Sequence, residues 1–134
     1  MIETSITELN EYLSPSVQTL GGKITDFDAS NGEITMGFEA VDAFCHSGNI
    51  VQGGYITGML DSAMTWSVRG NLGKEAAVPT LEIKINFIAP GNPGELVAKA
   101  RPVHLGRSTA FLSGELYQHG QLVATGTSTT RLFR

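Results

Sequence analysis

One carboxylate lies in the middle of an apolar segment. Asp61 is the only acidic residue between Ile56 and Val68, and the apolar residues of that segment recur at helical spacing. Aspartate is a poor residue for a helix interior and prefers caps. Exposure on the wet face of a helix is the simple explanation. The functional one is a carboxylate that attacks an electrophile or activates a water molecule.

Two glycines just before this segment could supply a complementary group. Gly53 and Gly54 follow Gln52 at the expected start of the helix, so their amides belong to the unpaired N–H groups at the positive end of the helix dipole. Such amides suit the oxyanion that forms when a carbonyl is attacked, and glycine allows the reacting carbon to come close. The alternative is an ordinary glycine-containing cap.

A stripe of small and polar residues runs beside the apolar face of the same helix. Its members share i, i+3 and i+4 spacing and are Gly54, Thr57, Gly58, Asp61 and Thr65. Small side chains allow a close approach. Either a ligand lies along the stripe, or the equivalent helix of a second subunit packs against it, or both.

Composition excludes several classes of protein. With 134 residues and 41% apolar side chains, the chain can bury a core as one domain spanning residues 1–134. The net charge of −4 and the dispersed basic residues give no footprint for nucleic acid or an anionic membrane surface. We expect a cytoplasmic protein, because the sequence shows neither a signal peptide nor an apolar run of about 20 residues. One cysteine and three scattered histidines indicate no metal site and no cofactor.

The pattern of residues predicts the elements that must hold these groups. Ser5 to Glu8 fits a capping box at the start of a short helix. A hairpin follows, with strands at residues 23–27 and 34–38, and then the long helix, for which Gly70 and Asn71 are the stop signals.

From Val78 to Phe133 the alternation is that of strands, with Leu81, Ile83, Ile85 and Phe87 expected on one face. Turn residues at 90–94 and 118–121 divide this half into at least three strands. A single apolar helix must bury most of its circumference, which a curved sheet can accomplish. We predict an α+β hotdog fold, in which five to six antiparallel strands wrap around one long central helix.

The segment from His46 to Gly54, followed by Asp61-Ser62-Ala63, resembles the signature of PaaI-type hotdog acyl-CoA thioesterases. The resemblance continues through residues 79–90, 94–96, 104–107 and 120–127, and so covers nearly the whole chain. It implies that the Gly53 amide polarises a thioester carbonyl, while Asp61 of the neighbouring subunit attacks it or activates water. Thr65 matches an assisting hydroxyl, and Thr80 one that helps to place the water.

The same resemblance suggests further substrate contacts. Gln52 stands where the family usually has histidine, and His46 stands where relatives place an asparagine or glutamine that contacts the carbonyl or the water. Asn49 lies nearer the helix, and Gly54 follows Gly53. Arg107 and Ser108 occupy a loop position where relatives often contact phosphate or pantetheine. A lone loop histidine or an exposed arginine also occurs without any function.

These features predict an acyl-CoA thioesterase that acts as a homodimer or as a homotetramer built from dimers, with the active site at the subunit interface. A non-catalytic acyl-CoA binder or sensor is the alternative, although a binder has no use for Asp61 beside an electrophile. A dehydratase or hydratase ranks last, because the helix contains no histidine. The acyl group, coenzyme A versus carrier protein, and the role of Asp61 as nucleophile or general base stay open. Pocket depth depends on residues such as Tyr55, Met59, Trp66 and Phe87.

Overall fold

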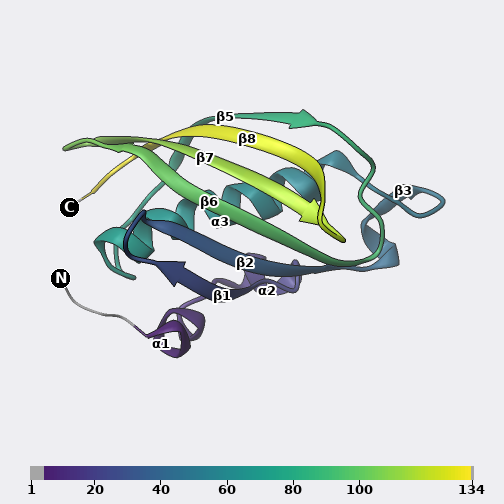
Figure 1. The fold of residues 1–134 in the computed structure, drawn as a ribbon, viewed down its shortest axis with the longest axis horizontal. Helices are drawn as coiled ribbons and strands as arrows, with labels where there is room; N and C mark the ends of the chain where they lie inside the picture. Colours follow the sequence, from purple (N-terminus) through teal and green to yellow (C-terminus); the bar gives the residue numbers. More distant parts are fainter. Residues whose placement is uncertain (1–4, 134) are drawn as a thin grey trace.

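The computed structural model describes residues 5–133, which form one large antiparallel sheet and one long helix (Figure 1). The elements follow in the order α1 (Ile6–Glu11), α2 (Pro15–Thr19), β1 (Lys23–Asp28), β2 (Glu33–Ala40), a 3-10 turn (Asp42–Phe44), β3 (Cys45–Ser47), β4 (Ile50–Val51), α3 (Gly53–Leu72), β5 (Thr80–Phe87), β6 (Gly94–Leu105), β7 (Thr109–Gln118) and β8 (Gln121–Arg131).

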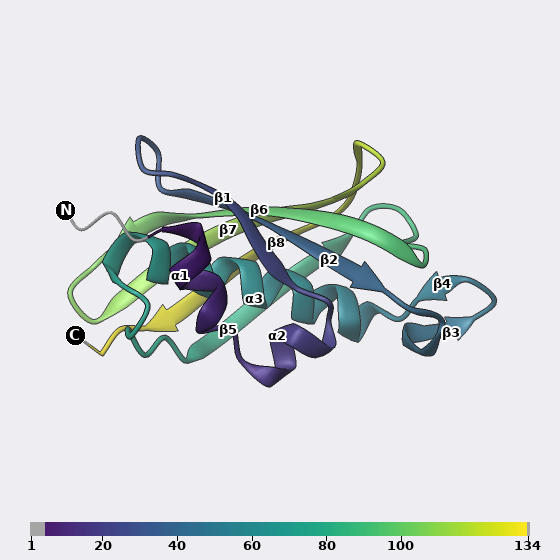
Figure 2. The same cartoon turned by 90° about the horizontal axis from the view of Figure 1, so that it is seen from below.

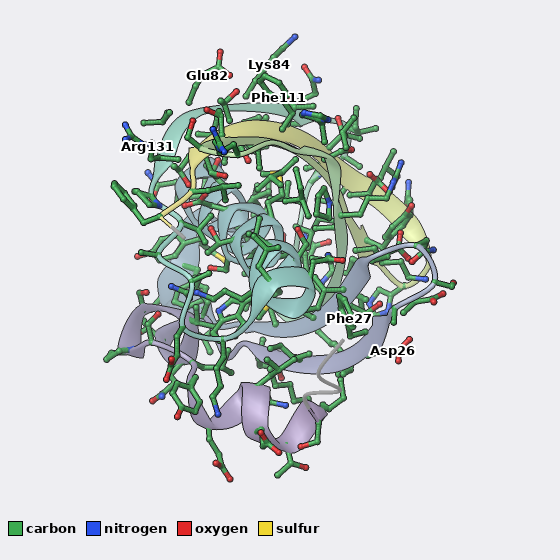
Figure 3. The ribbon with its side chains drawn as sticks, turned by 90° about the vertical axis from the view of Figure 1, so that its left-hand side faces the viewer. Asp26, Phe27, Glu82, Lys84, Phe111 and Arg131 are labelled. Carbon is green, nitrogen blue, oxygen red and sulfur yellow. The ribbon has the colours of Figure 1, made fainter. Side chains whose placement is uncertain are left out.

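The main sheet has six strands in the order β1-β2-β6-β7-β8-β5, and every pairing is antiparallel. The sheet curves around α3, and the side chains of Glu82, Lys84 and Phe111 point away from the helix on its outer face (Figure 3). The predicted hotdog architecture, with five to six strands around a central helix, is therefore confirmed.

The core lies between α3 and the inner face of the sheet. The helix contributes Ile56, Met59, Leu60, Ala63, Met64, Trp66 and Val68 to it, all of them buried. One row of paired residues across the sheet is small where the helix crosses it, since Ala100, Gly114 and Gly126 are partners on β6, β7 and β8. A methyl group added at Gly114 would lie 3.3 Å from Met64 and 3.4 Å from Leu60, so these glycines allow the helix to pack closely.

The predicted N-terminal elements are present. The Ser5 hydroxyl accepts a hydrogen bond from the Glu8 N–H at the start of α1, and the hairpin of β1 and β2 is confirmed. Helix α2 was not predicted; Ser14 caps it and Pro15 opens it. Its neighbour Leu20 lies against Gly58, so part of the stripe of small residues on α3 packs within the same chain.

Helix α3 runs slightly further than predicted. It continues through Gly70 and Asn71 to Leu72, and Gly73 ends it with a φ of 121°. The Asn71 side chain bonds the carbonyls of Ser67 and Gly32 and so ties the end of the helix to the turn of the first hairpin. No helix within residues 5–133 is long and apolar enough to span a membrane.

The segment before α3 forms a small hairpin of its own. In the described part of the chain, strands β3 and β4 pair only with each other, outside the main sheet. Figure 2 shows this hairpin at one end of the molecule, beyond the start of α3. From the sequence, candidate contact residues were expected in this segment, but no hairpin was predicted.

Candidate active site

The carboxylate of Asp61 is held by a hydroxyl from the sheet. Asp61 lies in the middle of α3 and is half-buried, and its Oδ1 accepts a hydrogen bond of 2.8 Å from the Thr80 hydroxyl at the start of β5. The second oxygen accepts no hydrogen bond from the described residues, so it is open to water or substrate. A fixed carboxylate with one free oxygen can act as a base or as a nucleophile.

A β-bulge directs Thr80 toward the helix. Thr80 pairs with Thr130, whereas Glu82 already pairs with Thr129, so Leu81 is the extra residue. Strict alternation would place Leu81 on the inner face with Ile83. The prediction for Leu81 is therefore wrong: its side chain is 62% exposed, and Thr80 takes the inward position.

The other candidate group lies at the start of α3. Within the described residues, the N–H groups of Gly53 and Gly54 have no hydrogen-bond acceptor, while those of Tyr55 and Ile56 already bond the Gln52 carbonyl. A Cβ at Gly53 would lie 2.9 Å from the Phe87 ring, whereas one at Gly54 would meet nothing within 4 Å. Gly53 thus allows Phe87 to pack on the first turn of the helix, and both amides remain available as donors.

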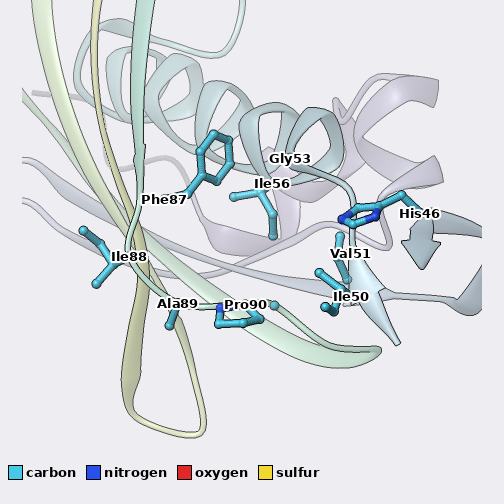
Figure 4. Close-up of a pocket in the computed structure, with 10 residues that line it drawn as sticks. His46, Ile50, Val51, Gly53, Ile56, Phe87, Ile88, Ala89 and Pro90 are labelled. Atoms are coloured by element: carbon cyan, nitrogen blue, oxygen red, sulfur yellow. The ribbon is translucent and has the colours of Figure 1, made fainter. Parts of the chain in front are cut away.

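A pocket of about 440 Å³ opens beside these amides. Its walls come from the β3–β4 hairpin, the first turn of α3, the end of β5 and the loop after β5 (Figure 4). The lining residues are mostly apolar, with His46 the only titratable one: His46, Ile50, Val51, Gly53, Ile56, Phe87, Ile88, Ala89, Pro90 and Gly91. The pocket is suited to an uncharged, apolar group next to an oxyanion donor.

The hairpin carries three of the predicted residues. His46 lines the pocket together with Gly53, and its Nδ1 lies 2.9 Å from the Ser47 hydroxyl. Asn49 is exposed in the turn of the hairpin. Gln52 is exposed, and its side chain does not cap α3; the backbone N–H of Gln52 instead bonds the Phe44 carbonyl at 2.9 Å. The loop is therefore anchored by backbone, not by the glutamine amide.

Asp61 and Gly53 do not meet within one chain. They are eight residues apart on one straight helix, which corresponds to about 12 Å along its axis. Thr65 is one turn beyond Asp61, and its hydroxyl has no hydrogen-bond partner among the described residues. The hydroxyls of Thr57 and Ser62, by contrast, bond carbonyls of their own helix. The chain thus presents two separate groups of candidate residues, called below the Asp61 half-site and the Gly53 half-site.

The remaining predicted residues lie near the Asp61 half. Arg107 and Ser108 form the exposed turn between β6 and β7. The Ser108 carbonyl accepts from the Leu132 N–H, just beyond the β8 residues that pair with the start of β5. They are at the end of the sheet where β5 begins, whereas the Gly53 pocket is where β5 ends.

Sequence reasoning missed most of the pocket. Of the four residues suggested to set its depth, only Phe87 lines it; Met59 and Trp66 are buried in the core, and Tyr55 stacks on Phe44. Of the loop at residues 88–91, only Pro90 and Gly91 belonged to the predicted break between strands, and no pocket was predicted there. An apolar residue in a turn, Ile88 close to Pro90 and Gly91, was the one feature of the sequence that could have indicated a pocket wall here.

The chain is similar to known proteins over the segment that carries both half-sites. The sequence pattern described as thioesterase superfamily matches residues 48–125, which include both Gly53 and Asp61. No curated protein matches the chain significantly. Among solved structures, a phenylacetic acid degradation-related protein of Ralstonia eutropha is 36% identical, with a TM-score of 0.83 over 89% of this chain and 91% of that one.

Two more distant structures share the fold. The phenylacetic acid degradation protein PaaI of Thermus thermophilus, solved as a mutant, is 24% identical with a TM-score of 0.78, and the match covers 90% of this chain and all of that one. A thioesterase of Haemophilus influenzae is 19% identical with a TM-score of 0.88, covering 99% of this chain and 93% of that one. The chain therefore belongs to the thioesterase superfamily, as a hotdog-fold thioester hydrolase of the PaaI type.

Proposed function

We propose that the protein hydrolyses an acyl-CoA thioester to a free carboxylic acid and coenzyme A. The observation that carries this proposal is the mid-helix carboxylate of Asp61, held at 2.8 Å by Thr80 with one oxygen open. A carboxylate half-buried beside the apolar face of a helix costs stability and needs a compensating role. Accepting a proton beside an electrophilic thioester, or attacking it as a nucleophile, would be such a role.

A dimer through β5 would complete the site. The other edge of the sheet is blocked, because the Asn10 side chain bonds both the N–H and the carbonyl of Ile24 on β1. The outer edge of β5 pairs with no strand among residues 5–133, and an open edge is a template for a second strand. Two copies of β5 paired antiparallel would set the Phe87 end of one beside the Thr80 end of the other. Gly53 of one protomer would then face Asp61 of its partner.

In this composite site the groups divide the reaction between them. The Gly53 amide donates to the thioester oxygen as it gains charge, with the Gly54 amide next to it. Asp61 either takes a proton from the attacking water or adds to the carbonyl carbon, forming an anhydride that water then cleaves. Both routes break the C–S bond, and the thiolate of coenzyme A that leaves takes up one proton of the water consumed. Thr80 orients Asp61, and the free hydroxyl of Thr65 and the ring of His46 can hold water or the carbonyl.

The surroundings agree with a coenzyme A ester. The acyl group fits the apolar pocket between Phe87 and the β3–β4 hairpin. Across the proposed dimer, Arg107 and Ser108 of one chain come near the Gly53 end of the other, where Arg107 can pair with a phosphate. Gln52 and Asn49 are exposed at the rim and can bond the pantetheine amides. We place the enzyme in the cytoplasm, as a homodimer or as a dimer of dimers.

Free-thiol release from phenylacetyl-, hexanoyl- and decanoyl-CoA tests the function. We expect turnover by the wild type and a loss of at least 100-fold in kcat for Asp61→Asn, with binding of the ester retained. The exposed change Asp26→Asn is the matched control and should leave turnover unchanged. Slow and equal turnover in wild type and Asp61→Asn, with tight binding in both, would instead indicate a binding protein.

A further inference from the structure

A buried glutamine that belongs to neither half-site stands out among the polar residues of the core. Gln118, at the end of β7, is only 6% exposed. Its side-chain amide makes three hydrogen bonds, all to backbone: it accepts from the Asn92 N–H at 2.9 Å and donates to the carbonyls of Asn92 at 2.8 Å and Glu95 at 3.3 Å. Both backbone groups of Asn92 are thus held by one side chain.

Asn92 in turn holds the opposite wall of the pocket. Its side-chain Nδ2 donates to the Asn49 carbonyl in the turn of the β3–β4 hairpin at 2.9 Å. One residue earlier, the Gly91 carbonyl accepts from the Val51 N–H at 2.9 Å. The hairpin pairs with no main-sheet strand among residues 5–133, and these two bonds connect it to the loop after β5.

From these contacts we infer that Gln118 and Asn92 are positioning residues, which together form a clamp that sets the width of the acyl pocket and thereby its selectivity. This inference rests on the proposed function. Neither residue lines the pocket. Gln118 fixes the far end of the loop at Asn92, and Asn92 fixes the hairpin against that loop, so the two walls keep a constant separation around the acyl group.

The clamp acts on the walls and not on the oxyanion donor. The first turn of α3 is anchored separately, by the buried Ile56 and by the bond from the Gln52 N–H to the Phe44 carbonyl. Loosening the clamp should therefore displace the hairpin while Gly53 stays in place. Substrate affinity and chain-length selectivity should change more than kcat, on which only His46 of the hairpin can act.

Two substitutions test this at different points of the clamp. Asn92→Ala removes only the bond to the hairpin and leaves the backbone bonds of Gln118 intact; one hydrogen bond corresponds to a rise in KM of about three- to tenfold. Gln118→Met keeps the length of the side chain and removes all three bonds, so KM should rise at least tenfold. For both, the ratio of kcat/KM between phenylacetyl-CoA and decanoyl-CoA should move toward one, and kcat should fall by a smaller factor than the one by which KM rises.

The double variant gives a sharper criterion. Because both residues act through one displacement, the rise in KM of the double variant over wild type should be smaller than the product of the two single rises. Asn31→Ala, in the β1–β2 turn, and Gln121→Met are matched controls on exposed residues outside the clamp and should leave KM, kcat and selectivity unchanged. A variant that lowers kcat and thermal stability with KM and selectivity unchanged would mean a general structural role and overturn the inference.

Hydrogen exchange separates this inference from the proposed function. The clamp variants should lower the protection of the Val51 amide at least tenfold, while the Ile24 amide, held by Asn10 on another edge of the sheet, keeps its protection. If the wild type hydrolyses neither ester but Val51 loses protection in both variants, the proposed function fails and the clamp stands. Unchanged protection at Val51 overturns the clamp whatever the activity.

Discussion

Two inactive variants that restore each other would show that the active site is shared between subunits. Gly53→Pro removes the amide donor and nothing else from the oxyanion site. Proline is favoured at the first position of a helix, where Gly53 lies, and the ψ of 141° at Gln52 is the backbone that a following proline requires. Asp61→Asn removes the carboxylate proposed as base or nucleophile. Each variant alone should be at least 100-fold slower than wild type.

The magnitude of the restoration follows from the geometry. A donor and an attacking group must both lie within about 3–3.5 Å of the reacting atoms, so they can be at most about 7 Å apart. Gly53 and Asp61 of one chain are separated by about 12 Å along α3. In a mixed dimer, one site has both intact residues and the other has neither. Equal co-expression makes about half of the dimers mixed, so about one quarter of wild-type activity should return.

The assay is thiol release by the co-expressed pair, compared with each variant expressed alone. Gly53→Ala is the steric control, because its methyl group also meets the Phe87 ring while the N–H remains. Its loss of activity measures the effect of crowding, and any further loss in Gly53→Pro belongs to the amide. Activity of the mixed preparation no higher than the sum of its parents would refute a site shared in this way.

Two hydroxyls on the inner face of the sheet give further predictions. Thr80→Val should lower kcat about ten- to hundredfold by releasing Asp61, and Thr80→Ser should recover most of it; equal kcat for the two would argue against the hydrogen bond having a role. Thr130 is fully buried, and its hydroxyl has no partner among residues 5–133. Thr130→Val should therefore raise the free energy of unfolding by about 1 kcal/mol, seen as a rise of a few degrees in Tm, whereas the exposed Thr127→Val gives no such gain. A drop in Tm for Thr130→Val would show that its hydroxyl is satisfied.

The elements with local signals could be predicted, and those that depend on distant pairing could not. The long helix and the first hairpin follow from the period of their apolar residues and from turn chemistry. The bulge at Leu81 does not, because it arises from the register between β5 and β8, some 50 residues apart in the chain. The same holds for the clamp: Gln118 reaches Asn92 across 26 residues, and Asn92 reaches Asn49 across 43.

In the candidate site, too, the residues with a local signal could be predicted and those that depend on distant pairing could not. Asp61 and the two glycines attract attention from sequence alone, because an acid inside an apolar helix and two glycines at its start both break local preferences. Thr80 was suggested only by resemblance, since alternation along β5 would have turned it outward. The hydrogen bond to Asp61 depends on the extra residue at Leu81, which local patterns do not encode.

The candidate catalytic groups without a hydrogen-bond partner lie beside the one open edge of the described sheet, so the proposed reaction and the proposed dimer depend on the same strand. The free amides at Gly53 and the open oxygen of Asp61 lie near opposite ends of β5, the one strand of the described sheet whose outer edge is unpaired and unblocked. Within a monomer these groups are too far apart to share a carbonyl. A two-fold axis through the middle of β5 exchanges its ends, so a single symmetric contact would both cover the exposed edge and bring each amide to the other carboxylate. The strand that closes the dimer would then be the one that aligns the catalytic groups, because Thr80 and Phe87 at its two ends each contact one of them.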